Sequence, residues 1–442
     1  MRVKSVTCIP IAIAIVCCWA ARTRSEDNTE AFPGARSLTR TPFRLILPRD
    51  HLLGDWFGAR PWLEDHGITP VLTFVSDALG NPVGGRQQGF TAANNLNLES
   101  NFDLEKLAGI EGGSFLASAS YRFGSNLSRE YIGNAFTVQQ VFGGETFRLV
   151  SLSYLQKLLE NRVEFRLGRI ATGDDFLVSP YNYVFVQNGF DGNPVGIFFN
   201  SPGMTAYPND TWGARIKVRP TPRSYIMGGI YNGDPSIRAN DHHGVDFSMH
   251  GPLFAIMEIA YERNSLPGDR GLIGNYKAGY WYDDSRYTDF NTGAVTRGNW
   301  GFYGMFDQVL VRFGEFASYR GFGVAASFLA SPDQSISQMP YFFTAAFVTR
   351  GIFPSRPVDI LALGVVFGHF SDDLQDAQRR AQQLGSNVGV QTHETVVELT
   401  YRVAFLRSAL YIQPDLQYII RPGGTGRIPD ALTLGAQVGV NF

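Results

Sequence analysis

Short runs in which apolar and polar residues alternate recur along most of this 442-residue chain, and they restrict its fold more than any other feature. In ETVVELTYRV, Glu394, Glu398 and Arg402 occupy one side, and valine, leucine and tyrosine lie between them. A period of two residues is typical of β-strands with one apolar and one polar face. Sixteen such runs are recognisable, and most have the roughly 9–11 residues that a tilted strand needs to cross a bilayer. The predicted strands are residues 70–79, 95–104, 112–122, 146–157, 161–170, 211–219, 224–232, 253–263, 275–283, 298–312, 322–331, 341–350, 358–370, 391–403, 409–420 and 431–442.

The connections between the predicted strands alternate between long and short. Long connections such as 123–145 and 171–210 follow odd-numbered strands, and short ones such as 158–160 and 220–223 follow even-numbered strands. This asymmetry is typical of outer-membrane barrels, which have long extracellular loops and short periplasmic turns. We therefore predict an all-β protein, an antiparallel up-and-down transmembrane β-barrel of about sixteen strands over residues 70–442. An even strand number places both termini on the periplasmic side.

A secreted β-propeller or β-sandwich is the alternative fold. Either would explain the strands but not the loop asymmetry, and both would bury the apolar faces in a core. No sequence repeat of about 20–50 residues is visible, which further disfavours a propeller.

The N-terminal residues 1–21 have the layout of a secretory signal peptide, with Arg2 and Lys4 before an apolar run. Cleavage is expected after Ala21 or a few residues later; a membrane anchor is the alternative. All three cysteines lie in this segment, so the mature chain offers no disulfide, thiolate nucleophile or cysteine-bound zinc. Residues 22–69 are predicted to form a periplasmic linker and a short helical segment, broken near Pro61 and ended by Gly67.

Charge indicates which face of each strand meets water. Acidic residues (40) nearly balance basic ones (38), which does not favour a nucleic-acid partner. An Arg or Lys on the lipid face at mid-membrane costs about 2–4 kcal/mol, so the charged side of each strand should face the lumen. A sixteen-stranded barrel is wide enough for an aqueous channel, and this one would have a polar lining of both signs.

The connection 171–210 is the longest, and its many aromatic and amide residues favour an ordered structure. Folded into the barrel, it would narrow the lumen with groups suited to sugars, which offer C–H faces to rings and hydroxyls to amides, carboxylates and guanidinium groups. The alternative is a loop that only caps the barrel mouth. The candidate channel-lining residues are Arg122, Glu164, Arg166, Tyr181, Phe190, Asp191, Phe199, Arg215, Glu398, Arg402 and Asp415.

Two further segments carry predictions. In the strand 431–442, Leu434, Val438 and Phe442 would face outer-membrane lipid, and the final Phe442 resembles the signal that barrel-assembly machinery recognises. The segment 371–385 is predicted to be a surface helix with Ser371 as its N-cap and Gly385 at its end.

Several motifs together resemble the carbohydrate-selective porins of the OprB type. They are LLGDWFGARPWLEDHGI near the N-terminus, GNPVGGRQQG at 80–89, and YIQPDLQYIIRPGG with DALTLGAQVGVNF at the C-terminal end. The likeness covers roughly residues 50–442, with Phe57 standing where the family leads us to expect glycine. The resemblance implies a sixteen-stranded porin that passes glucose and related sugars, with Arg, acidic and aromatic residues at its constriction.

Other functions stay open at this point. A general or anion-selective diffusion porin is one alternative, although an anion-selective lumen should carry a basic excess. An outer-membrane barrel enzyme is less favoured, because no Ser/His/acid motif is recognisable. We expect no cofactor and no metal; small sugars are the expected partners, and a homo-oligomer is compatible with the sequence.

Overall fold

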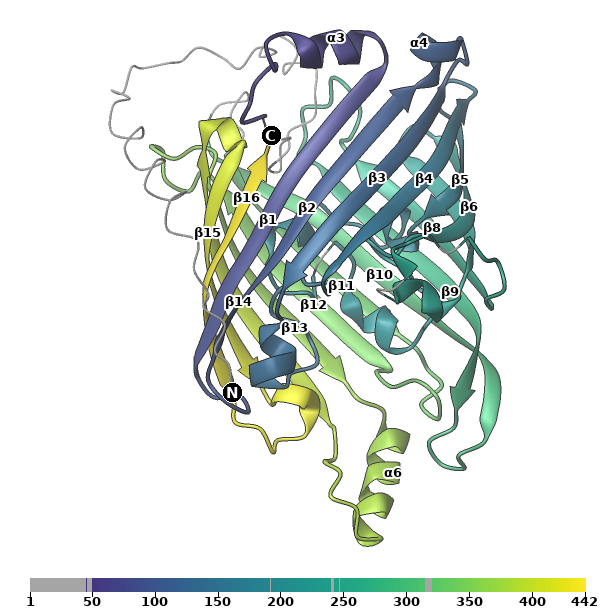
Figure 1. Cartoon of the computed structure of the whole chain (residues 1–442), viewed down its shortest axis with the longest axis vertical. Helices are drawn as coiled ribbons and strands as arrows, with labels where there is room; N and C mark the ends of the chain where they lie inside the picture. The colour runs from purple at the N-terminus through teal and green to yellow at the C-terminus, as the bar shows by residue number, and fades with distance from the viewer. Residues whose placement is uncertain (1–44, 46–49, 191, 240–241, 246, 315–319) are drawn as a thin grey trace, which may run out of the picture.

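The computed structural model describes residue 45 and residues 50–442, except for 191, 240–241, 246 and 315–319. Sixteen antiparallel strands form a closed barrel in which each strand pairs with its sequence neighbours and the first pairs with the last (Figure 1). The strands are β1 (Ile68–Val83), β2 (Phe90–Asp103), β3 (Gly113–Gly124), β4 (Thr146–Leu158), β5 (Val163–Ile170), β6 (Thr211–Thr221), β7 (Ser224–Asn232), β8 (Leu253–Arg263), β9 (Gly274–Thr288), β10 (Val295–Arg312), β11 (Gly321–Ala330), β12 (Tyr341–Arg350), β13 (Ile360–His369), β14 (His393–Phe405), β15 (Leu410–Ile420) and β16 (Ala431–Asn441).

All sixteen predicted strands are present, with ends that differ by a few residues, so the predicted fold is confirmed. The signal peptide and most of the linker lie outside the described residues, and the proposed cleavage stays a prediction. The α-helices are α3 (Ala59–Asp65), α4 (Leu104–Ala108), α5 (Thr172–Asp175) and α6 (Asp372–Gln383). The short π or 3-10 turns are η2 (Ser128–Ile132), η3 (Asn182–Val184), η4 (Val195–Phe199), η5 (Pro235–Arg238), η7 (Leu406–Ser408) and η8 (Pro422–Gly424).

Among the described helices, none has the length and apolar character needed to cross a membrane.

Alternation along the strands sets the two surfaces of the barrel. On β14, Glu398 is 0% exposed and its neighbour Leu399 is 45% exposed. On β15, Gln413 is likewise buried and Ile412 exposed. The inward-facing side chains are shielded from water because loops fill much of the lumen. The prediction that charged residues face inward on these strands is confirmed.

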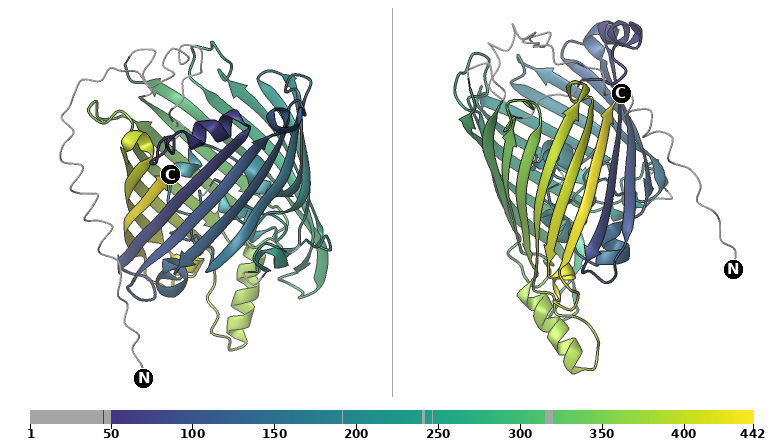
Figure 2. Two further views of the ribbon diagram at one scale, coloured as in Figure 1. Left: turned by 45° about the horizontal axis from the view of Figure 1, so that its top comes forward. Right: turned by 90° about the vertical axis from the view of Figure 1, so that its left-hand side faces the viewer.

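The two ends of the barrel are distinct, and we call them the α3 end and the α6 end (Figure 2). At the α6 end, helix α6 begins where predicted, since the Ser371 hydroxyl accepts a hydrogen bond from the Leu374 N–H at 3.2 Å. At the α3 end, the predicted break at Pro61 is wrong. Helix α3 starts only at Ala59, so Pro61 lies in its first turn, where the helix does not need its N–H. Phe57 has a φ of 58°, a conformation that glycine adopts at less cost.

The segment before α3 and the first turn of α3 hold the end of the chain at the seam where β16 pairs with β1. The Leu52 N–H donates to the Asn441 carbonyl at 2.7 Å, and the Arg60 Nη2 donates to the Phe442 backbone oxygen at 2.6 Å. Arg60 is buried, and its guanidinium carbon lies 4.5 Å from the centre of the Trp56 ring. The LLGDWFGARPW motif therefore holds the last residues of the closing strand.

We expect Arg60→Gln to weaken this seam. Hydrogen bonds to charged groups contribute about 1.5–3 kcal/mol, so the variant should lose its barrel form at a lower temperature. Heat-induced mobility shift on gels, with thermal circular dichroism in detergent, measures the change. Asp65→Asn on the exposed face of the same helix is the matched control. Equal transition temperatures for wild type and Arg60→Gln would show that the motif does not hold the seam.

Candidate functional site

The connection between β5 and β6, residues 171–210, folds into the lumen and is anchored by carboxylates on the barrel wall. Glu398 of β14 accepts hydrogen bonds from the N–H groups of Val186 at 2.7 Å and Gln187 at 3.1 Å. On the other side, Glu258 of β8 accepts one from the Leu177 N–H at 3.2 Å. Buried backbone N–H groups need acceptors, and wall carboxylates supply them here. We call this segment the β5–β6 loop; of the two alternatives that the sequence left open, it enters the barrel rather than only capping the mouth.

Further anchors come from carboxylates that sequence reasoning did not single out. Asp283 of β9 accepts from the Gly203 N–H at 2.7 Å, and Asp307 of β10 accepts from the Ser179 hydroxyl at 2.9 Å. Both stand at inward positions of strands, so their lumenal parity could have indicated them.

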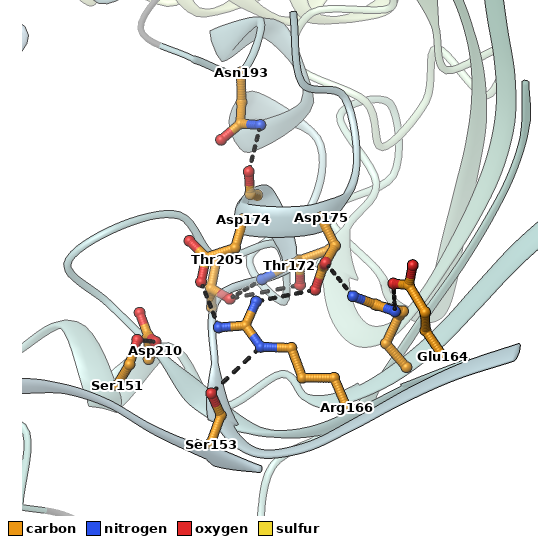
Figure 3. A network of polar contacts seen from close by, with 12 residues as sticks. Ser151, Ser153, Glu164, Arg166, Thr172, Asp174, Asp175, Asn193, Thr205 and Asp210 are labelled. Carbon is orange, nitrogen blue, oxygen red and sulfur yellow. Dashed lines mark hydrogen bonds and ion pairs between the residues drawn. The ribbon is translucent and has the colours of Figure 1, made fainter. Parts of the chain in front are cut away.

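A network of charged residues fixes the start of the β5–β6 loop (Figure 3). Arg166 of β5 pairs with Asp174 at 3.3 Å and with Asp175 at 3.2 Å. Arg215 of β6 pairs with Asp175 at 2.7 Å and with Glu164 at 3.1 Å. Three predicted residues, Glu164, Arg166 and Arg215, thus come together around helix α5. Asp175 is held from both sides, whereas Asp174 is held by Arg166 alone among these cations.

Asp174 of this network and the nearby Asp210 have raised pKa values. Burial in the lumen, and next to it the charge of Asp210, raise the pKa of Asp174 well above that of an ordinary aspartate, while Arg166 opposes the shift. Burial also raises the pKa of Asp210 to about 6, against the hydrogen bond from Ser151 and the charge of Arg166. A mildly acidic medium therefore reduces the negative charge facing Arg166.

Two cavities meet inside the barrel beside the β5–β6 loop. The loop-side pocket, of about 270 Å³, is bordered by loop residues such as Phe142, Asn209 and Arg238. The wall-side pocket, of about 340 Å³, is bordered by wall residues such as Val75 and Gln437. The residues common to both linings are Arg122, Gln140, Asn193, Ala206 and Tyr207. These five residues, which we call the constriction ring, separate the two pockets.

Arg122 and Tyr207 are fixed within the constriction ring. The Arg122 guanidinium carbon lies 5.1 Å from the centre of the Tyr207 ring, and its Nη1 donates to the Phe142 carbonyl at 3.3 Å. The Tyr207 hydroxyl donates to the Asn97 side chain at 3.0 Å. A guanidinium, an aromatic ring and amides therefore line both pockets at the constriction ring.

The predicted aromatic residues occupy other places. Phe190 is buried and stacks on Phe185, with ring centres 4.1 Å apart. Phe199 packs edge-on against Phe136 at 5.8 Å. Tyr181 is buried and borders a separate cavity of about 750 Å³ that is lined by turns of the α3 end. None of the three borders the two pockets at the constriction ring, and Asp191 lies outside the described residues.

Arg402 and Asp415 belong to the supporting wall. Arg402 Nε donates to the Gln413 side chain at 2.6 Å, and its Nη2 donates to the Tyr183 carbonyl at 3.0 Å. Asp415 accepts from the Gln417 amide at 2.8 Å. Of the predicted lining residues that the structure describes, only Arg122 lies in the constriction ring.

Gln140, Asn193 and Tyr207 were missed as candidates. Asn193 and Tyr207 stand in the aromatic- and amide-rich stretch that had been noted, but no pattern distinguishes them from their neighbours. Gln140 lies in the connection between β3 and β4, whose sequence has no pattern that indicates a role in lining the channel. Within the described residues, no group of His, Cys, Asp and Glu could hold a metal ion.

A closed β-barrel with a narrowed, polar lumen defines a membrane channel. The family model described as carbohydrate-selective porin, OprB family, matches residues 87–442, so the chain belongs to that family. It is an outer-membrane porin that passes carbohydrates, and it is not an enzyme.

Three relatives illustrate the similarity. Porin B of Pseudomonas aeruginosa is 29% identical over 422 residues, covering 88% of this chain and 91% of the relative. The putative porin QuiX of Acinetobacter baylyi is 28% identical over 420 residues, covering 89% and 93%. The high-pH structure of Pseudomonas putida OprB superposes with a TM-score of 0.82 at 26% identity, covering 90% of this chain and all of the other.

Proposed function

We propose that sugars cross this channel passively through the constriction ring, and that the ring selects them over other solutes of similar size. The observation that carries the proposal is the position of the ring between two lumenal pockets that share its residues. A solute that passes from the loop-side pocket to the wall-side pocket meets Arg122, Gln140, Asn193 and Tyr207 together.

The chemistry of the ring suits a polyhydroxylated solute. The guanidinium of Arg122 is a planar fork of donors that matches two neighbouring hydroxyls. The amides of Gln140 and Asn193 can both donate and accept. Arg166 near the ring forms ion pairs with Asp174 and Asp175 of α5, which neutralise its positive charge. The passage therefore does not carry basic groups alone.

The arrangement in the membrane follows from the same proposal. The α3 end would face the periplasm, which places both termini there, and the α6 end would face the outside. The apolar outer surface would contact outer-membrane lipid. Recognition of the strand ending at Phe442 by barrel-assembly machinery, and assembly into a homo-oligomer, stay predictions from the sequence.

Liposome swelling tests the proposal. Vesicles containing the protein should admit D-glucose faster than a neutral amino acid of similar size. At the ring, the sugar hydroxyls form hydrogen bonds to the protein that replace the hydrogen bonds to water that the sugar loses there. Zero-current potential in a salt gradient provides the second readout and should show weak ion preference. Entry that ranks solutes by size alone would indicate a general porin, and a strong chloride preference would indicate an anion-selective one; either result overturns the proposal.

A further inference from the structure

We propose that the side chain of Leu45 forms a second narrowing of the channel, at the α3 end of the lumen and separate from the constriction ring. Leu45 lies outside the sixteen strands, since β1 begins only at Ile68. Its side chain is nevertheless 2% exposed and belongs to the hydrophobic cluster of the barrel interior. The chain that leads into the barrel would thus limit passage through its own channel, whichever solutes the constriction ring admits.

Leu45 borders the cavity of about 750 Å³ at the α3 end, which we call the α3-end cavity. Tyr181 borders this cavity from the side of the β5–β6 loop. Asn161, Pro222 and Leu266 border it from the turns that join β4 to β5, β6 to β7 and β8 to β9. The cavity therefore lies between the β5–β6 loop and the α3 end of the wall, on the path of a solute that leaves the lumen at this end.

The backbone at Leu45 is held against the wall by Arg350, the last residue of β12. Arg350 is 4% exposed, and its Nη1 donates to the Leu45 carbonyl at 3.0 Å. A buried guanidinium group requires hydrogen-bond acceptors, so this contact stabilises Leu45 in the lumen. At the seam of the barrel, Asn441 Nδ2 donates to the Asp50 carbonyl at 2.8 Å. Because β12 and β16 are four places apart in the barrel, Leu45 is held away from that seam.

The lining of the α3-end cavity makes an apolar residue effective there as a barrier. Glu160, Arg162 and Asn275 border the cavity and can form hydrogen bonds with water. The side chain of Leu45 offers no hydrogen bond to water or to a hydrated ion. Hydrophobic constrictions restrict conduction by excluding water, so a leucine at this place should raise the barrier for ions and hydrated solutes.

Single-channel conductance in the absence of sugar tests the inference. Leu45→Ala should raise the conductance, because a smaller side chain leaves a wider opening with less apolar surface. Leu45→Met keeps the volume and the apolar character and should conduct as wild type does. Leu53→Ala is the matched control and should also conduct as wild type does, because Leu53 precedes the same helix α3 but is 59% exposed. Heat-induced mobility shift on gels establishes that each variant forms the barrel.

Zero-current potential in a salt gradient provides a second measurement. Leu45→Glu should shift this potential toward cation preference, because a carboxylate at a narrow point of a pore attracts cations and repels anions. Leu53→Glu should leave the potential unchanged. Titration with D-glucose separates Leu45 from the constriction ring, since the glucose concentration that halves the current should be the same in Leu45→Ala as in wild type.

Wild-type conductance in Leu45→Ala would overturn the inference, as would a zero-current potential that Leu45→Glu leaves unchanged. A higher conductance of Leu45→Ala together with weaker glucose block would mean that Leu45 acts by supporting the β5–β6 loop. That result would also overturn a narrowing that is separate from the constriction ring.

Discussion

Replacing Glu398 by alanine should give a channel with higher conductance and no measurable sugar block. Glu398 accepts hydrogen bonds from the Val186 and Gln187 N–H groups, and its side chain is fully buried. Each buried donor left without a partner costs about 1–3 kcal/mol, so the β5–β6 loop should leave this part of the wall. The constriction ring depends on the position of that loop.

Single-channel recording of Glu398→Ala measures both effects. Glu398→Gln keeps one acceptor oxygen and should fall between wild type and alanine. Glu262→Gln is the control, because Glu262 of β8 pairs with Arg219 of β6 at 2.8 Å and has no contact with the loop backbone among the described hydrogen bonds. A wild-type conductance together with wild-type glucose block in Glu398→Ala would contradict the role of the carboxylate as an anchor.

Replacing Arg122 by alanine should lower the affinity of sugar block by about tenfold or more while the conductance stays similar or rises. The reason is that a charged donor contributes about 1.5–3 kcal/mol to a hydrogen-bonded ligand. The comparison with Arg166→Ala separates two roles. Arg166 pairs with Asp174 and Asp175, so its loss should also loosen α5 and lower barrel stability.

Titration of glucose against single-channel current, with thermal denaturation of each variant, distinguishes these outcomes. Arg122→Lys keeps the charge but not the planar fork and should recover only part of the affinity. Unchanged glucose affinity in Arg122→Ala would remove Arg122 from the selective step.

The strands could be predicted from the sequence because a barrel with an apolar outer surface and a polar interior imposes a strict rule on each residue. Leu399 lies on the outer surface and Glu398 faces the lumen, and a shift of one residue would exchange them. The prediction needed only local alternation and loop length. The register of β14 against β15 pairs Leu399 with Leu416, so residues that face the same side of the barrel lie opposite each other on neighbouring strands.

The arrangement inside the lumen could be predicted only in part. The sequence indicated that Arg122 faces the interior of the barrel, and it offered entry of the β5–β6 loop as one of two alternatives. It did not indicate which aromatic residues pack and which stay exposed, since Phe190 and Tyr183 have similar neighbours in the chain. That choice depends on contacts with distant strands, such as those from Arg402 and Gln413 to the backbone at Tyr183 and Val184.

The single-channel current of the wild-type protein under increasing D-glucose tests sugar selection by the constriction ring most directly. A channel with a binding step inside its lumen should show current that falls along a saturating curve, with block by glucose stronger than block by a neutral amino acid of similar size. A current that falls only in proportion to the viscosity of the solution, equally for both solutes, would contradict sugar selection at the ring.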